Sequence, residues 1–531
     1  MPPSSHANQP NSPRTTVTIL STQPLHGSQN PTSPYHPGPL DYLVSPGIPI
    51  AVVFIYSPLL SRAPQPAIDA SRLQQALHRL LDYYPHLTGR LVIDPVMGNR
   101  QISRFEAGAQ LLLAESAEGL SGLTGRSSGR GTGGRLTLAD LPGDWNALLS
   151  FPPIEAGIGV DTDVNVPLFS IQHTRFADGG VALGVCVSHS VCDAEGFFML
   201  VRDLAELYRG LESGRAECNL KHPPHVDAYV PEVQQKDTPM EPPECEAAQF
   251  FLAPKMSEQT ETRDEPDNSL ADAAEIPKAP TASDDEGPAA STADSPSDPI
   301  IGRVLHFSAE ELAVLKMKAT GSTPDAWVST FEALAAHLAQ RIYQARVRSR
   351  EQQGLSKPPS SNFLTPLNWR SPSRLNLPSS YFPNALICAV TTLPPDLLEH
   401  ESLADVAAAI HALIRSLKPT HAEHIVQWIA AQPEPARIEQ RFDYGPGSLM
   451  LSQWSGIEMY ADMGFNADES GNVQLPVLVA PPFTHISLMD GLGYVLPAQP
   501  TRAEYGNIDG GPGGVDVNLA LAKSVWDSLI V

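Results

Sequence analysis

Residues 181–210 read VALGVCVSHSVCDAEGFFMLVRDLAELYRG, and this stretch decides the fold of the region around it. Up to Ser188, apolar residues alternate with small or polar ones, which is the period of a half-buried strand. After Asp193 the apolar residues recur at helical spacing, and Asp193 itself stands where a helix N-cap is expected. The sequence therefore predicts a strand, a tight turn that carries His189, and a helix. Functional side chains are often placed on such turns.

His189 and Asp193 form the pattern H-x-x-x-D, which is weak evidence when it is taken alone. The same pattern occurs at His78 and Asp82, inside a stretch with helical apolar spacing, where it is typical of a solvated helix face. On the evidence of residues 181–210 alone, a hydrogen-bonded core histidine beside an N-cap aspartate is an equal alternative to a catalytic His189.

Length and charge limit the class of protein. The chain has 531 residues, 42% of them hydrophobic, which is enough for two ordinary domains with sizeable cores. The formal net charge is -24, but residues 231–300 hold 17 acidic and 4 basic residues and so contribute 13 of these charges. The rest of the chain is only mildly acidic, and nothing in it is basic enough to follow a phosphate backbone. We expect no nucleic-acid partner.

The cysteines and the N-terminal sequence predict where the protein is found. Five cysteines without C-x-x-C spacing are typical of reduced thiols in a cytosolic protein, and they predict no metal site. The N-terminus lacks the apolar core of a signal peptide, and the longest apolar run near it, residues 48–56, is too short to span a bilayer. We therefore expect a cytoplasmic protein that is not inserted into a membrane.

The order of the predicted elements indicates the fold class. Strand and helix patterns mix in both halves of the chain without a β-α-β rhythm, which favours two α+β domains. Residues 231–300 are rich in Glu, Asp, Pro, Ala and Ser and poor in aromatic residues, so they cannot bury enough surface to offset the entropy of ordering. The sequence predicts an N-terminal domain at 1–230 that carries H-x-x-x-D, an acidic disordered linker at 231–300, and a C-terminal domain at 301–531.

Six stretches along the chain resemble one family. They are PLD at 39–41, YPHLTGRL at 84–91, HSVCDAEG at 189–196, STPDAWVSTFEALAAH at 322–337, NWRSPSRLNLPSSYFPN at 368–384 and LSQWSGIEMYADMGF at 451–465. Together and in this order they resemble the BAHD acyltransferases, the acyl-CoA-dependent O- and N-acyltransferases, and most of all the fungal trichothecene 3-O-acetyltransferase-like branch. The acidic segment falls at the crossover between the two domains of that family.

The resemblance implies a chloramphenicol acetyltransferase-like fold, in which two α+β domains of similar topology each have a mixed sheet with flanking helices. An active-site channel lies at the domain interface, and CoA and the acceptor enter it from opposite faces. The resemblance also implies a monomer of secondary metabolism with no permanently bound cofactor. It would take acyl-CoA as co-substrate and move an acyl group, acetyl or another short one, to the hydroxyl, less readily the amine, of a small molecule.

The resemblance assigns roles to particular residues. It implies that His189 is the general base, that Asp193 forms a structural ion pair with Arg370, and that Asn384 and Asp462 support the site. An imidazole suits the first role because its unperturbed pKa is about 6.5, so that it is neutral near pH 7 and can take a proton from a hydroxyl. The candidate oxyanion donors are Ser452 and Trp454, for which a strand-end polar residue and a core aromatic are equal alternatives.

The sequence departs from the family pattern at several positions. The family motif D-F-G-W-G is reduced to DMGFN at 462–466, Pro383 precedes Asn384 in place of glycine, and Ala194 follows Asp193, with the glycine displaced to Gly196. The reduced motif supports a rival prediction, a catalytically silent ligand-binding protein on the same fold, although retention of the base and its partners argues against it. Ser188 stands in place of a second histidine, which weakens the alternative of a peptide-synthetase condensation-domain-like enzyme.

Overall fold

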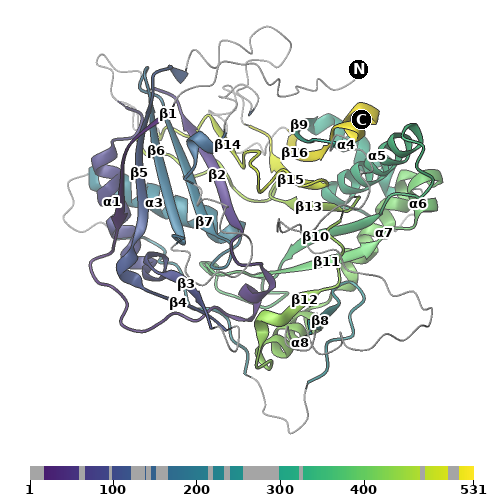
Figure 1. Cartoon of the computed structure of the whole chain (residues 1–531), viewed down its shortest axis with the longest axis horizontal. Helices are drawn as coiled ribbons and strands as arrows, with labels where there is room; N and C mark the ends of the chain where they lie inside the picture. The colour runs from purple at the N-terminus through teal and green to yellow at the C-terminus, as the bar shows by residue number, and fades with distance from the viewer. Residues whose placement is uncertain are drawn as a thin grey trace, which may run out of the picture.

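Two six-stranded sheets occupy the two halves of the molecule (Figure 1). The computed structural model describes residues 17–58, 66–94, 99–120, 138, 145–150, 166–212, 219–232, 240–254, 298–321, 327–445, 447–466, 473–499 and 514–530.

The first sheet is built mainly from the N-terminal half. Its strands, in spatial order, are β1 (Val17–Leu25), β5 (Ala109–Ser116), β6 (Phe169–Phe176), β7 (Val181–Ser188), β2 (Pro49–Tyr56) and β14 (Leu478–Ala480). Only β5 and β6 pair in parallel among these neighbours. Helices α1 (Ala70–Tyr83) and α3 (Ala194–Glu212) pack together and share a hydrophobic core with one face of the sheet.

Strand β7 follows the predicted bounds, but the prediction that it is half-buried is wrong. Every residue from Val181 to Val187 is buried. Leu148 and Leu149 pack against the face with small side chains, and a Cβ at Gly184 would lie only 1.9 Å from the carbonyl oxygen of Leu148. Small residues on this face therefore serve close packing and not solvent exposure.

The second sheet is built from the C-terminal half. Its strands, in spatial order, are β11 (Leu386–Thr392), β10 (Asn362–Asn368), β13 (Leu449–Gln453), β15 (Leu492–Pro497), β16 (Gly514–Ala522) and β9 (Ile300–Ser308). Its helices are α4 (Ala309–Thr320), α5 (Thr330–Gln352), α6 (Pro395–His400), α7 (Leu403–Ser416), α8 (Pro419–Ala430) and α9 (Lys523–Ser528). Helix α4 begins at a capping box, in which Ser308 and Glu311 exchange hydrogen bonds. Thirteen of the 23 residues of helix α5 are buried.

Short elements complete the fold. The paired strands are β3 (Arg90–Ile93) with β4 (Arg100–Ser103) and β8 (Phe250–Leu252) with β12 (Ile438–Gln440). The 3-10 turns are η1 (Pro39–Leu43), η2 (Pro85–Thr88), η3 (Phe105–Ala107), η5 (Trp145–Leu148) and η7 (Pro435–Arg437).

The segment predicted as a linker differs in part from that prediction. Strand β8 lies inside 231–300 and pairs with β12, because Phe250 and the preceding Ala247 and Ala248 are apolar and bury themselves in the C-terminal core. Residues 233–239 and 255–297 lie outside the described residues. Strand β14 also crosses the expected division, since it leaves the C-terminal half to pair with β2. The domain boundaries themselves remain a prediction.

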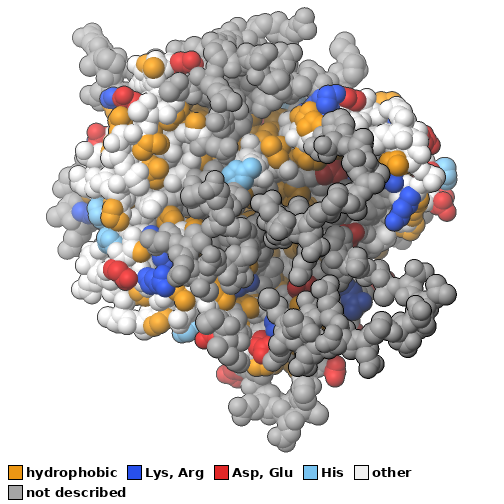
Figure 2. Space-filling view, viewed as in Figure 1, with side chains coloured by type: hydrophobic (Ala, Val, Ile, Leu, Met, Phe, Trp, Pro, Cys, Tyr) orange, Lys and Arg blue, Asp and Glu red, His pale blue; other side chains and the backbone are white. Residues whose placement is uncertain are grey.

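The surface is mixed in character. On the face shown in Figure 2, basic, acidic and apolar side chains are interspersed. Among the described helices, none is both long enough and apolar enough to cross a bilayer.

Candidate active site

The predicted strand, turn and helix place His189 directly after β7, at the turn that leads into α3. The backbone N–H of His189 donates to the carbonyl oxygen of Ile48, 2.8 Å away, which ties the turn to the chain that enters β2. Glycine is required at Gly196 in the first turn of α3, since a Cβ there would lie 2.1 Å from the carbonyl oxygen of Phe382. The displaced glycine of the sequence thus lets α3 approach the segment that carries Asn384.

Asp193 both caps the helix, as its sequence position predicts, and forms the ion pair that the family resemblance implies. As an N-cap it accepts the backbone N–H of Gly196 at 3.3 Å. As an ion-pair partner it binds Arg370 through two hydrogen bonds, of 2.7 Å and 2.8 Å, and it also accepts the backbone N–H of Ala385 at 2.9 Å. The Asp193 side chain is 1% exposed and that of Arg370 11%, so this bidentate pair is shielded from water.

Arg370 extends the pair to the backbone around Asn384. Its guanidinium also donates to the carbonyl oxygens of Tyr381, at 3.1 Å, and Pro383, at 2.7 Å. The N-terminal end of α3 is therefore fastened to residues 381–385 through one buried carboxylate and one guanidinium.

The amide of Asn384 fixes the tautomer of His189. Its Nδ2 donates to the Asp41 carboxylate at 2.8 Å and to the His189 carbonyl oxygen at 2.9 Å, and both of these groups are acceptors only. The amide oxygen then faces Nδ1 of His189 at 3.1 Å, so Nδ1 must carry the proton. The lone pair of the ring is consequently on Nε2, the nitrogen that a general base needs.

Electrostatics keep the imidazole neutral. Burial lowers the pKa of His189 below that of a free imidazole, although backbone carbonyls, the charge of Asp193 and the hydrogen bond to Asn384 partly oppose this lowering. At pH 7 the ring is therefore able to accept a proton.

A cavity of about 340 Å³ lies beside this turn, between the start of α3 and the C-terminal half of the chain. Asp193 and Glu195 line it from α3, and Ser452 and Trp454 from the end of β13. Two arginines, Arg374 and Arg415, also line it.

The two candidate oxyanion donors lie together in this cavity. The indole N–H of Trp454 donates to Oγ of Ser452 at 3.0 Å, and the ring packs edge-on against Phe198 and Tyr494. The indole N–H is thus already occupied, whereas the Ser452 hydroxyl still has its own proton to donate. Of the two, Ser452 is the residue that can reach a ligand directly.

Asp462 lies apart from the other predicted site residues. Its backbone carbonyl accepts Nη1 of Arg209 at 3.4 Å, near the C-terminal end of α3, so it is roughly 22 Å along the helix from the first turn beside Asp193. The Asp462 side chain is exposed and its backbone is left-handed, with φ of 58°. It supports the junction between the two halves of the molecule and not the surroundings of His189.

Sequence reasoning did not assign roles to five residues at or near this site. Asp41 was visible only as part of PLD, and Glu195 only as a residue of the α3 first turn. Arg374 and Arg415 come from the loop after β10 and from α7, and no local pattern relates them. Trp327 is 53% exposed, and the side chains of Arg415 and Lys316 lie over its ring at 5.5 Å and 5.8 Å.

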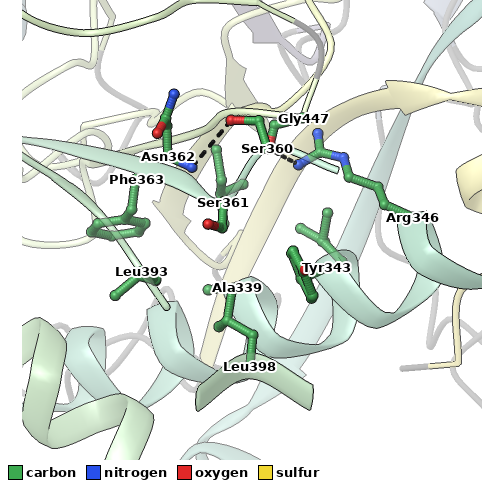
Figure 3. A pocket seen from close by; sticks show the side chains of 12 residues that line it. Ala339, Tyr343, Arg346, Ser360, Ser361, Asn362, Phe363, Leu393, Leu398 and Gly447 are labelled. Atoms are coloured by element: carbon green, nitrogen blue, oxygen red, sulfur yellow. Dashed lines mark hydrogen bonds between the residues drawn. The ribbon is translucent and has the colours of Figure 1, made fainter. Parts of the chain in front are cut away.

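A second cavity is too small for a substrate. It has about 10 Å³, room for roughly one water, and it lies between α5 and the start of β10 (Figure 3). Arg346 borders it, with a buried ion pair to Asp490 at 2.9 Å and a hydrogen bond to the carbonyl oxygen of Gly447. This arrangement serves packing of the C-terminal half.

Comparison with known proteins identifies the family. A family model described as the Transferase family matches residues 38–491. The chain therefore belongs to this family, that of the BAHD acyltransferases, as the six stretches predicted.

Three relatives illustrate the range of similarity. An eremophilane O-acetyltransferase of Penicillium rubens is 30% identical over 167 residues, which cover 30% of this chain and 35% of that protein. A taxadien-5-alpha-ol O-acetyltransferase of Taxus chinensis is 31% identical over 159 residues, or 30% of this chain and 32% of the relative. An anthranilate N-benzoyltransferase of Dianthus caryophyllus is 25% identical over 372 residues, which cover 69% of this chain and 67% of that protein. The match to the O-acetyltransferases spans about a third of their length.

Solved structures confirm the fold class. The structure of F. sporotrichioides TRI101 complexed with coenzyme A and T-2 has a TM-score of 0.64 at 17% identity and covers 93% of this chain and 96% of that one. Vinorine synthase has a TM-score of 0.57 at 16% identity and covers 97% of both chains. The predicted α+β architecture is that of these proteins.

Proposed function

We propose that this protein transfers an acyl group from acyl-CoA to a hydroxyl, less readily an amine, of a small-molecule acceptor, with His189 as general base. The observation that carries the proposal is the hydrogen bond between Nδ1 of His189 and the Asn384 amide oxygen, because it leaves a lone pair on Nε2 of a neutral imidazole. Family membership supports the reaction class, and relatives named as O-acetyltransferases and N-benzoyltransferases support the choice of acceptor atoms.

In this mechanism Nε2 of His189 takes the acceptor hydroxyl proton while the oxygen attacks the thioester carbonyl. The tetrahedral intermediate carries its negative charge on the former carbonyl oxygen, to which the Ser452 hydroxyl donates. Collapse breaks the carbon–sulfur bond, and the CoA sulfur receives the proton from the imidazolium. The products are an ester and free CoA, and no acyl-enzyme is formed. Trp454 acts by holding Ser452 in place.

We assign the donor side to the cavity beside Asp193. A cavity of about 340 Å³ is within the range that small-ligand sites occupy. Arg374 and Arg415 supply positive charge for the phosphates of CoA. TRI101 has been solved with coenzyme A and with T-2 or deoxynivalenol, which supports an acyl-CoA donor and an alcohol acceptor here.

We further propose that the acyl group is acetyl or another short one, and that the protein acts as a cytoplasmic monomer in secondary metabolism. The relatives named as an eremophilane O-acetyltransferase and a taxadien-5-alpha-ol O-acetyltransferase support the short acyl group. Retention of the full hydrogen-bond network around His189, despite the reduced DMGFN motif, supports an active enzyme over a silent ligand-binding protein.

The test is release of CoA thiol from a panel of acyl-CoAs in the presence of alcohol and amine acceptors, with acyl-CoA binding measured by calorimetry in parallel. We expect acceptor-dependent thiol release that His189→Ala lowers by about 10²-fold or more without changing acyl-CoA affinity. Binding of acyl-CoA without acceptor-dependent release across the panel, with equal affinity in His189→Ala, would establish the silent ligand-binding protein instead.

A further inference from the structure

The Asp41 carboxyl lies behind the base and is almost sealed from solvent, with 2% exposure. It belongs to the turn η1, and the three groups that donate to it are neutral N–H groups. One oxygen accepts the backbone N–H of Asn384 at 3.1 Å and the side-chain Nδ2 of Asn384 at 2.8 Å. The other oxygen accepts the backbone N–H of Gly38 at 2.7 Å.

We propose that Asp41 is a positioning residue for the base: it fixes the Asn384 amide in the orientation that presents the amide oxygen to Nδ1 of His189. This inference rests on the proposed role of His189. The relay runs from the Asp41 carboxylate, through the Nδ2 and Oδ1 of Asn384, to the imidazole. Asp41 itself touches neither the imidazole nor the space where substrates would lie.

The alternative orientation of the amide shows why this matters. If the Asn384 amide were reversed, its NH₂ group would face Nδ1, and the imidazole would have to carry its proton on Nε2 and lose the lone pair needed there. Two acceptors oppose this reversal, the Asp41 carboxylate and the carbonyl oxygen of His189. In Ser-His-Asp enzymes, loss of the carboxylate that holds the tautomer costs about 10⁴ in kcat. If the Asp41 carboxylate is removed here, the carbonyl oxygen of His189 still restrains the Asn384 amide, so we expect a smaller loss of kcat.

The ionisation of Asp41 suits this role. Burial raises the pKa of Asp41 to about 6, while the hydrogen bonds from Asn384 and Gly38 lower it in part. At pH 7 the carboxyl is therefore mainly ionised, and both of its oxygens are acceptors. An Asn side chain at position 41 would turn its NH₂ group toward one of these N–H donors. The hydrogen bond on that side would then be lost.

The experiment is a double-mutant cycle of Asp41→Asn and Asn384→Ala, read out as kcat, KM for acyl-CoA and Tm. We expect Asn384→Ala to lower kcat by about 10²-fold and Asp41→Asn by about 10-fold, with KM changed less than about 2-fold. If Asp41 acts through Asn384, adding Asp41→Asn to Asn384→Ala causes no further loss. Additive losses, a change confined to KM, or full kcat in Asp41→Asn would overturn the inference.

Asp203→Asn is the matched control. Asp203 is another buried carboxylate of the same half of the chain, its pKa is raised by burial to about 7, and it accepts the hydroxyl of Tyr84 at 2.5 Å, which an Asn oxygen can replace. We expect its kcat to stay within about 2-fold of wild type. A loss equal to that of Asp41→Asn would assign the effect to buried carboxyl groups in general and overturn the inference.

Two further variants keep the outcomes separate. If Asp41→Asn yields too little folded protein, Asp41→Ser enters the same cycle, because it removes the charge with less bulk and keeps an acceptor. His189→Ala distinguishes the two proposals. An active His189→Ala contradicts the general base, whereas an inactive His189→Ala beside a fully active Asp41→Asn contradicts only the role of Asp41.

Discussion

The protonation state of His189 follows from where the ring lies. Burial disfavours the charged imidazolium and lowers the pKa, and Asp193, which would favour the charge, is itself neutralised by Arg370. Asn384 then selects the tautomer. A neutral ring with its lone pair on Nε2 is therefore the resting state at pH 7.

The dependence of kcat/KM on pH tests this state. The base works only when it is unprotonated, so activity is present above its pKa and is lost as the pH falls through it. Because the pKa of His189 is lowered, we expect the acidic limb to lie below pH 6.5, the value of a free imidazole being about 6.5. The measurement is kcat/KM for the acceptor at saturating acyl-CoA, taken from about pH 4.5 to about pH 9 in steps of about half a pH unit. A limb centred above pH 7 would contradict the account.

The hydroxyl of Ser452 gives a second prediction at this scale. Trp454 donates to its oxygen, so the Ser452 proton remains available to a ligand in the cavity that both residues line. Ser452→Ala should lower kcat by about 10- to 10³-fold with little change in KM, since an oxyanion forms only after attack. Trp454→Phe, which keeps the aromatic packing, should lose less. Wild-type kcat in Ser452→Ala would mean that Ser452 has no catalytic role and is simply a polar residue at a strand end.

At the scale of elements, one side chain joins α3 to the chain that follows β10. Asp193 caps α3 at Gly196 and binds Arg370, which in turn donates to the backbone at Tyr381 and Pro383. The turn with His189 and the segment with Asn384 therefore keep one relative position.

This junction is tested by a double-mutant cycle of Asp193→Asn and Arg370→Gln, in which Tm and kcat are measured. Asn can still cap the helix, but it leaves a largely buried guanidinium without its counter-ion, and breaking such a pair costs about 3–5 kcal/mol. We expect Tm and kcat to fall together in each single variant, and the double variant to lose less than the sum. Additive changes in both quantities would mean that the two residues do not act as a pair.

The local elements could be predicted from the sequence, but the contacts between them only in part. The change of period at Asp193 predicted the turn because both periods lie within thirty neighbouring residues. The pairing of Asp193 with Arg370 spans 177 positions and came only from the family resemblance. Arg374, Arg415 and Trp327 lie on three segments that are far apart in the sequence, and neither pattern nor resemblance related them.

At the scale of the whole molecule, the two halves are joined by short pieces of the C-terminal chain. Strand β14 has three residues, too few for a periodic pattern, so its place beside β2 could not be predicted. The DMGFN segment also spans the junction: Tyr56 donates to the carbonyl oxygen of Met463 at 2.8 Å, and Asn466 donates to the carbonyl oxygen of Ala67. Asn466, which stands in place of the final glycine of the family motif, thus makes a side-chain hydrogen bond that glycine could not make.

Restoring the glycine tests whether this contact matters for stability alone. Asn466→Gly removes the hydrogen bond to Ala67 and a longer one of 3.5 Å from Arg72, at about 1 kcal/mol each, so we expect Tm to fall by roughly 2–6 °C. Turnover should be unchanged, because the segment lies at the far end of α3 from His189. Asn219→Gly, at an exposed Asn that accepts the Tyr83 hydroxyl, is the control. A loss of kcat without a fall in Tm would place Asn466 in the catalytic machinery.

The most direct test of the central claim is acceptor-dependent CoA release by His189→Ala, measured beside His78→Ala, which changes an exposed histidine in the other H-x-x-x-D match. We expect a loss of about 10²-fold or more in kcat for His189→Ala, with Tm and acyl-CoA affinity unchanged, and wild-type turnover for His78→Ala. Wild-type turnover in a folded His189→Ala protein would contradict the role of His189 as general base.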